Sequence, residues 1–351
     1  MSGPGTRGRV TGPVVTGPVV TVTLNAALDV TYRVARLRAG TSHRVEEVLE
    51  RAGGKGVNVA AVLHGSGVPV LATGLLAGEA GRRVRADLDA RGVPHRFVDV
   101  PGETRRTLTV VEGAGGTGDA TALNEPGPVV GPSDAARALD ELAAVLRDAR
   151  PAVVVVSGSL PPGLDEAVVA RLLDVAAQLG AATVLDTGGR SLLRTLEGLH
   201  DAGAPGPDVV KPNRPELAEL LAVARTGSSD EQGAEEATDE SVAEGAGVAL
   251  LRRLGARTVV VSSGGAGLTL HPVDGPPLTA RLPQPLTGHP TGAGDAAVAA
   301  LAAGLRAGAP WADVAADAVA RSAAAVLRPV AGEVDPADVA RLRGQVVLDG
   351  A

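Results

Sequence analysis

Pro290-Thr291-Gly292-Ala293-Gly294-Asp295 runs directly into the alanine-rich segment AAVAALAAGLRAG, residues 296–308. A glycine-rich turn therefore opens a segment of high helix propensity. Glycine allows backbone angles that are closed to other residues and lets another group approach closely. The first amides of a helix lack partners within it and the helix dipole is positive there, so the turn suits an anion beside the Asp295 carboxylate. This pattern indicates phosphoryl transfer, although an ordinary capped helix would look the same locally.

A second glycine turn, residues 53–58, also opens an expected helix. It supplies a cation, Lys55, and an amide side chain, Asn58. The turn is not a Walker A loop, because Gly56 rather than Ser or Thr follows the lysine. The residues alone leave two interpretations open: a ligand-binding turn, or a tight helix start with an exposed lysine.

The composition of the 351-residue chain excludes several classes of function. The chain has no cysteine, which removes disulfides, thiolate metal sites and cysteine nucleophiles. Its net charge of −7 and its three aromatic residues argue against binding to nucleic acid or to an anionic membrane. It contains neither an apolar run of about 18 residues nor a signal-peptide pattern. We expect a cytoplasmic protein with no nucleic-acid or membrane partner.

The order of the segments predicts an α/β fold. Residues 1–18 are rich in Gly, Pro and Thr and are expected to form a flexible tail, and residues 19–24 the first strand. The stretches around 103–112 and 119–126 predict a pair of strands in a small antiparallel sheet. From residue 134 onward strands alternate with helices, which is typical of a parallel sheet. The acidic stretch 225–247 is predicted to be a mobile surface insertion, partly helical at its end.

Polar residues stand where the predicted parallel strands end. Ligands bind beyond the carboxyl ends of such strands, and these ends carry Ser157, Ser159, Asp186, Asn213, Glu216 and Ser262. Asp29 is either a solvated turn residue or a carboxylate that accepts hydrogen bonds from sugar hydroxyls. Arg105 is either a surface charge or, on a lid, a group that holds a substrate phosphate.

Seven motifs, taken in their order along the chain, resemble those of the ribokinase (PfkB) family of carbohydrate kinases. They are AGGKGVNVA (52–60), ETRRTLTV (103–110), LNEPGP (123–128), VSGSLPPG (156–163), VKPNRPEL (210–217), VSSGGAG (261–267) and PTGAGDA (290–296). The resemblance covers roughly residues 19–335. TLNAALD (23–29) and LNEPGP are similar to the 1-phosphofructokinase and tagatose-6-phosphate kinase branch of the family.

The resemblance implies a mostly parallel central sheet flanked by helices, with a small β-sheet lid. One kinase domain would span residues 19–351, with lid segments at about 29–50 and 103–124. ATP would be the co-substrate and Mg²⁺ the cofactor. A homodimer would form through the lid.

The resemblance also implies roles for particular residues. Asp295 would be the catalytic base, and Gly292, Ala293 and Gly294 its anion hole. The sugar site would consist of Asp29, Gly54, Lys55 and Asn58. Arg105 would contact the phosphate of the substrate. The nucleotide side would consist of Lys211, Ser262, Gly264 and Gly267. Asn213 and Glu216 would organise Mg²⁺ and phosphate through water.

Two stretches depart from the pattern of this branch. Asn25-Ala26-Ala27 stands where the branch usually has Asn-Pro-Ala, which would loosen the turn before Asp29. Residues 262–267 read Ser-Ser-Gly-Gly-Ala-Gly where Ser-Leu-Gly is common. We expect ATP binding to survive this change, because glycine amides hold the nucleotide.

The expected reaction converts fructose 1-phosphate to fructose 1,6-bisphosphate, with fructose 6-phosphate and tagatose 6-phosphate as alternative acceptors. A non-catalytic sugar- or nucleotide-sensing protein is a different possibility. A dinucleotide-dependent oxidoreductase is disfavoured, because the glycines at 264–267 lead into a strand rather than a helix. We expect Asp295 to lie between the sugar pocket and the γ-phosphate, with Lys55 and Arg105 on the far side of the sugar.

Overall fold

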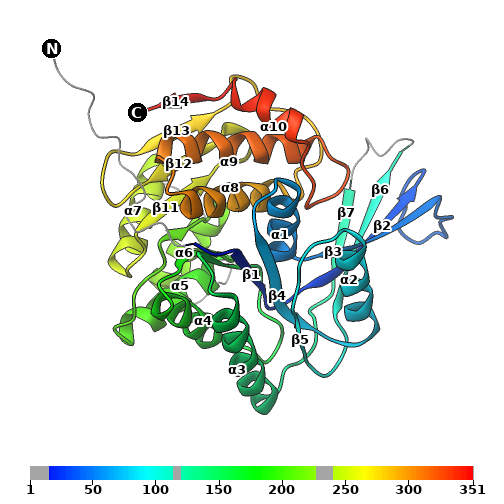
Figure 1. Ribbon diagram of the computed structural model, residues 1–351. Helices are drawn as coiled ribbons and strands as arrows, with labels where there is room; N and C mark the ends of the chain where they lie inside the picture. The colour runs from blue at the N-terminus through cyan, green and yellow to red at the C-terminus, as the bar shows by residue number, and fades with distance from the viewer. Residues whose placement is uncertain (1–15, 114–119, 227–239, 351) are drawn as a thin grey trace.

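The computed structural model describes residues 16–113, 120–226 and 240–350, which form a ten-stranded sheet, a four-stranded sheet and flanking helices (Figure 1). Seven strands of the large sheet are parallel, in the order β5 (Val98–Asp99), β4 (Val70–Leu76), β1 (Val19–Thr23), β8 (Val153–Ser157), β9 (Ala182–Asp186), β10 (Val209–Val210) and β11 (Thr258–Ser262). Three antiparallel strands complete it: β12 (Leu268–His271), β13 (Leu278–Arg281) and β14 (Val347–Asp349).

The parallel strands are buried on both faces, which explains their nearly continuous valine runs. In β8, Val153 and Val155 contribute to the hydrophobic core on one face of the sheet, and Val154 and Val156 to the core on the other. Successive side chains of a strand point to opposite faces, so a run such as VVVVS fills two cores at once.

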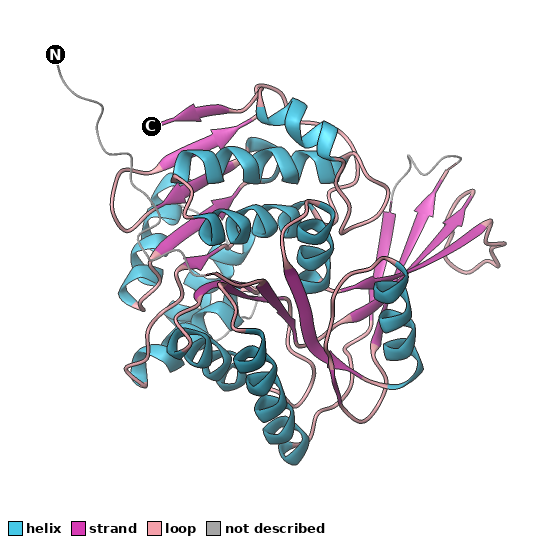
Figure 2. Ribbon diagram, viewed as in Figure 1, coloured by secondary structure: helices cyan, strands magenta, loops and turns pink. Residues whose placement is uncertain are grey.

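Helices cover both faces of the large sheet (Figure 2). One layer contains α1 (Lys55–Gly65), α8 (Ala293–Ala307), α9 (Trp311–Val326) and α10 (Pro336–Arg343). The opposite layer contains α3 (Pro132–Ala149), α4 (Glu166–Gln178), α5 (Gly189–Asp201), α6 (Arg214–Thr226) and α7 (Glu240–Arg253). The remaining helix, α2 (Gly78–Ala90), packs against the small sheet.

The small sheet stands beside the large one and projects from it (Figure 1). Its strand order is β3 (Glu47–Gly53), β2 (Ala27–Val34), β6 (Arg105–Glu112) and β7 (Ala120–Asn124). The β6–β7 pair is antiparallel, as predicted, whereas β2 and β6 pair in parallel. A parallel pair needs a long connection, and the whole segment from β3 to β5 lies between these two strands.

The predicted fold, a mostly parallel sheet flanked by helices with a small second sheet, is confirmed. Strands β13 and β14 were not predicted. Most of the predicted flexible tail (1–15) and of the acidic insertion (227–239) lies outside the described residues. The end of the acidic stretch belongs to α7, in agreement with the expected helix. None of the helices in the described parts of the chain is long and apolar enough to cross a membrane.

Candidate active site

A cavity of about 1450 Å³ lies beyond the carboxyl ends of the parallel strands. Every residue that the sequence analysis assigned to the site lines it: Asp29, Gly54, Lys55, Asn58, Arg105, Lys211, Asn213, Glu216, Ser262, Gly264, Gly267, Gly292, Ala293, Gly294 and Asp295. The fold therefore brings together two glycine turns that lie more than 200 positions apart in the chain. The individual roles of these residues remain predictions.

The turn at Gly292 has the geometry expected of an anion cradle, with one correction. Gly292 is the N-cap of α8 with φ 85°, and a Cβ there would lie 2.9 Å from Ala331, so only glycine fits. The Ala293 amide donates to the Pro290 carbonyl at 3.1 Å and is not free for a ligand. No backbone carbonyl among the described residues accepts from the amides of Gly294 or Asp295. These two amides, rather than that of Ala293, are available to an anion.

Asp295 lies in the first turn of α8 and is only 7% exposed. Its Oδ2 accepts a hydrogen bond of 2.8 Å from Nδ2 of Asn58 in α1. Burial and the nearby charge of Asp186 raise the pKa of Asp295 to about 6, although Asn58, Lys55 and Lys211 oppose this rise. The carboxylate is ionised at neutral pH and is a stronger base than an ordinary aspartate.

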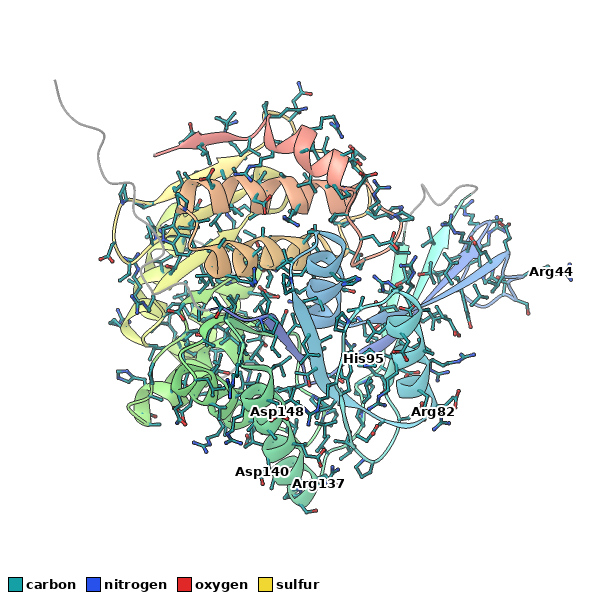
Figure 3. All side chains as sticks on the ribbon, in the orientation of Figure 1. Arg44, Arg82, His95, Arg137, Asp140 and Asp148 are labelled. Carbon is teal, nitrogen blue, oxygen red and sulfur yellow. The ribbon has the colours of Figure 1, made fainter. Side chains whose placement is uncertain are left out.

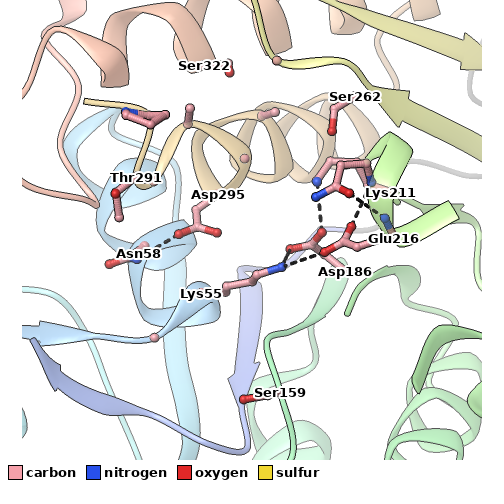
Figure 4. A pocket seen from close by; sticks show the side chains of 18 of the residues that line it. Lys55, Asn58, Ser159, Asp186, Lys211, Glu216, Ser262, Thr291, Asp295 and Ser322 are labelled. Carbon is pink, nitrogen blue, oxygen red and sulfur yellow. Dashed lines mark hydrogen bonds and ion pairs between the residues drawn. The ribbon is translucent and has the colours of Figure 1, made fainter. Parts of the chain in front are cut away.

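A network of opposite charges surrounds Asp186 at the end of β9 (Figure 4). Lys211 Nζ lies 3.0 Å from Asp186 Oδ1, and Lys55 Nζ lies 3.6 Å from Asp186 Oδ2. Ser157 Oγ also donates to this carboxylate at 2.9 Å. Burial by itself would raise the pKa of Asp186, but the two lysines hold it below its ordinary value. Asp186 is therefore a fixed negative charge that holds both lysines at the cavity.

Asn213 and Glu216 form a reciprocal hydrogen-bond pair at the start of α6. The Asn213 amide donates to Glu216 Oε2, and the Glu216 amide donates to Asn213 Oδ1, each at 2.8 Å. This arrangement is a capping box, which requires the Asn-x-x-Glu spacing. It leaves Glu216 Oε1 facing Lys55 Nζ at 3.6 Å.

The described residues contain no cluster of three or more metal-ligating side chains. Magnesium is usually held by one or two carboxylates together with substrate phosphates. Glu216, which lines the cavity and is oriented by Asn213, fits this requirement.

Asp29 and Arg105 occupy the end of the cavity nearest the small sheet. Burial raises the pKa of Asp29 to about 6, although Arg105 and a hydrogen bond from Thr107 oppose this rise. A Cβ at Gly53 would lie 2.1 Å from Asp29 Oδ2, so the glycine in this turn makes room for the carboxylate. Arg105 Nε donates to the Asn25 carbonyl at 3.1 Å.

The glycine loop after β11 forms a short 3₁₀ turn, Gly264–Ala266, and leads into strand β12. Gly267 has φ 95°, and a Cβ there would lie 2.1 Å from the Ala280 carbonyl. Beyond this loop the cavity is lined mainly by apolar side chains, among them Leu268, Leu282, Val319 and Val326. This apolar part has the character expected of a pocket for a nucleotide base.

Two features of the site differ from the sequence-based account. Lys55 was expected to face only the substrate, whereas its Nζ points toward two carboxylates and lies 3.6 Å from an oxygen of Asp186 and 3.6 Å from an oxygen of Glu216 (Figure 4). Asp186 was expected at a strand end, but its role in holding the two lysines was not predicted. The signal was present, because β9 is the neighbour of β10, and Lys211 directly follows β10.

Comparisons with known proteins show the family of this chain. The model of the pfkB family of carbohydrate kinases matches residues 20–338. The chain is 40% identical over 289 residues to 1-phosphofructokinase of Xanthomonas campestris pv. campestris, covering 82% of this chain and 83% of that protein.

Solved structures share the fold. A possible 1-phosphofructokinase of Thermotoga maritima has a TM-score of 0.77 at 27% identity, covering 95% of this chain and 99% of that one. Phosphofructokinase-2 of Escherichia coli, in complex with potassium, has a TM-score of 0.81 at 23% identity, covering 94% and 99%. The chain therefore belongs to the pfkB family of carbohydrate kinases, phosphotransferases that act on a sugar hydroxyl.

Proposed function

We propose that this chain transfers the γ-phosphoryl group of ATP to fructose 1-phosphate and forms fructose 1,6-bisphosphate and ADP. The observation that carries the proposal is the position of Asp295: a buried carboxylate at the N-terminus of α8, in one cavity with Arg105. The 40% identity to a 1-phosphofructokinase supports this acceptor over other sugars. ATP and sugar phosphates are cytoplasmic metabolites, so we place the reaction in the cytoplasm.

The bonds that change follow from the product. The acceptor hydroxyl oxygen forms a bond to the γ-phosphorus, and the bond from that phosphorus to the bridging oxygen of ADP breaks. Asp295 orients the hydroxyl and takes its proton, while Asn58 holds the carboxylate in place. The free amides of Gly294 and Asp295, at the positive end of the helix dipole, stabilise the negative charge of the transferred group.

The cations around Asp186 would act on the nucleotide side. Lys211 lies against Gly294, because a Cβ on that glycine would be 3.8 Å from Nζ, and so stands beside the anion cradle. Glu216, oriented by Asn213, would hold Mg²⁺ together with the phosphates of ATP, and the metal would supply positive charge against the negative charge that develops during transfer. Lys55, with its Nζ between the two carboxylates, keeps this part of the cavity electrically balanced in the absence of ligand.

The small sheet would serve both as a lid and as the contact between two copies. Its outer strand β7 is exposed along its full length, and Leu123 on that strand is 57% exposed. The sheet extends away from the main body as far as the loop that bears Arg44 (Figure 3). Pairing of two such sheets would cover the exposed edge of β7, which is otherwise an open template for another strand.

The test is ADP release by the purified chain with ATP and a panel of fructose 1-phosphate, fructose 6-phosphate, tagatose 6-phosphate and fructose. The proposal predicts the highest kcat/KM for fructose 1-phosphate. A higher value for either 6-phosphate would reassign the acceptor within the family. Binding of a sugar phosphate without any ADP release would instead indicate a sensing protein.

A further inference from the structure

Asn25 joins three chain segments at the mouth of the cavity. It lies two residues after β1, where the sequence departs from the usual Asn-Pro-Ala pattern, and is only 6% exposed. Its Nδ2 donates to the Pro126 carbonyl at 3.0 Å and contacts the Leu160 carbonyl and the Ser159 hydroxyl, each at 3.3 Å. The side chain thereby ties the end of β1 to the loop after β7 and to the loop after β8.

Backbone contacts complete this junction. The Asn25 carbonyl accepts from Arg105 Nε at 3.1 Å, so the same residue anchors the first residue of β6. Gly127 packs so closely against it that a Cβ would lie 2.3 Å from Asn25 Oδ1. Gly127 also has φ 102°, which favours glycine on its own account.

The junction directs two hydrogen-bond donors into the cavity. Since Nε of Arg105 is engaged by Asn25, its two Nη groups, which form no hydrogen bond with the described residues, stay free as a fork for an anion. Ser159 accepts from Asn25 Nδ2, so its own hydroxyl proton is left to donate elsewhere. Both Arg105 and Ser159 line the cavity.

We propose that Asn25 is a positioning residue that fixes Arg105 and Ser159 around the phosphate of the acceptor. The proposal rests on the proposed function, because it takes the acceptor to be a sugar phosphate. It predicts that loss of the Asn25 amide weakens recognition of the phosphate on the sugar and leaves ATP recognition intact, because its hydrogen bonds within the described residues reach no residue of the nucleotide side.

The decisive comparison is between Asn25→Ala and Asn25→Asp. We expect Asn25→Ala to raise the KM for the sugar phosphate roughly tenfold, while the KM for ATP changes less than about twofold. Asn25→Asp keeps the shape but turns acceptor oxygens toward the carbonyls of Pro126 and Leu160 and adds a negative charge near the phosphate. It should therefore raise this KM further than alanine does. Asn25→Leu adds the control for shape: if the side chain only fills space, this nearly isosteric uncharged variant would retain the wild-type KM, and the proposal would fail.

Thr21→Val is the matched control. Thr21 is a buried polar residue in the middle of β1, and its hydroxyl has no hydrogen-bond partner among the described residues, so its loss should leave both KM values unchanged. Gly127→Ala is a second probe if Asn25→Ala does not fold, because the added Cβ would displace the Asn25 side chain. This variant should also raise the KM for the sugar phosphate and leave the KM for ATP nearly unchanged.

The outcomes separate this proposal from the proposed function. If wild type prefers another sugar phosphate, the acceptor was misassigned, and the Asn25 variants are measured with the preferred one. If wild type turns over no sugar phosphate, the proposed function is wrong and Asn25 has no phosphate to position. Two results would overturn the Asn25 proposal alone. One is an equal increase in the KM for ATP and in the KM for the sugar phosphate. The other is an equal loss of kcat/KM with phosphorylated and with unphosphorylated sugar.

Discussion

Nδ2 of Asn58 donates to Oδ2 of Asp295 at 2.8 Å, across 237 positions of the sequence. This bond connects the first turns of α1 and α8, two helices that begin with glycine turns. The N-terminal turn contributes the amide that orients the carboxylate, and the C-terminal turn contributes the carboxylate and the free helix amides. The active site therefore exists only when the two turns meet.

Removing the Asn58 hydrogen bond should shift the pH dependence of kcat. This bond lowers the pKa of Asp295, which is about 6 in the wild type. The base must be ionised, so wild-type kcat is expected to fall as the pH drops through about 6. In Asn58→Ala the pKa rises, and the acidic limb of the profile moves to higher pH. Profiles at saturating sugar and ATP measure this shift; an unmoved or lower limb would contradict the assignment of Asp295 as base.

We expect the ionised Asp295 carboxylate to destabilise the native state at pH values above its pKa in the folded chain. Its pKa is about 6 in the folded chain against an ordinary 3.8, so the folded state binds the proton more tightly than the unfolded state. Folding is thus favoured by protonation, and the cost of the ionised form is complete above about pH 6. At pH 8 we expect Asp295→Asn to raise the free energy of unfolding by about 1–3 kcal/mol.

Urea unfolding at pH 8 and pH 4 measures this effect. The gain from Asp295→Asn should shrink toward pH 4, where the carboxyl is protonated in the folded state. An increase in the free energy of unfolding that is the same at both pH values would show that the stabilisation does not come from removing the charge of Asp295.

Arg105 and Arg106 offer a matched pair of substitutions. Arg105 lines the cavity, whereas Arg106 is exposed and pairs with Glu125. We expect Arg105→Ala to raise the KM for fructose 1-phosphate by about 10–100-fold and to change the KM for ATP little, because a phosphate contact of a charged group is lost. Arg106→Ala should change neither KM. Equal increases in both KM values for Arg105→Ala would remove Arg105 from the phosphate site.

Gly53 and Gly65 provide a second pair. A Cβ at Gly53 would collide with the Asp29 carboxylate, whereas a Cβ at Gly65, the last residue of α1, would have no described atom within 4 Å apart from its chain neighbours and its own helix backbone. Gly53→Ala should displace Asp29 and raise the KM for the sugar at least tenfold. Gly65→Ala should leave kinetics unchanged and stabilise the chain by about 0.4–1 kcal/mol. Wild-type kinetics in Gly53→Ala would show that Asp29 does not hold the sugar.

Local sequence patterns predicted the parts of the site that are made locally. The glycine turns at 53–56 and 292–294 and the Asn213-x-x-Glu216 pair carry their own backbone and capping rules. Strand ends such as that of β9 followed from the alternation of strands and helices. These features suffice to predict the α/β class and the edge of the sheet that binds ligands.

Long-range pairing could not be predicted in the same way. Nothing in the composition of β2 and β6 specifies that they pair in parallel, and β14 joins β13 from almost 70 positions away. The direction of Lys55 depends on Asp186 and Glu216, which lie on other elements. The engagement of the Ala293 amide by Pro290 depends on how the turn closes. Such contacts are set by the tertiary structure, and the local periodicity of the sequence does not predict them.

The most direct test of the central claim is the rate of ADP release with fructose 1-phosphate for wild type and Asp295→Asn, both at saturating substrates and pH 8. We expect rapid release by wild type and a kcat lower by about 10²–10⁴ in the variant, because general-base catalysis typically contributes that much. ATP affinity, measured by titration, should stay within about twofold, since the free amides of α8 remain. A folded Asp295→Asn variant that keeps near-normal turnover would contradict the account.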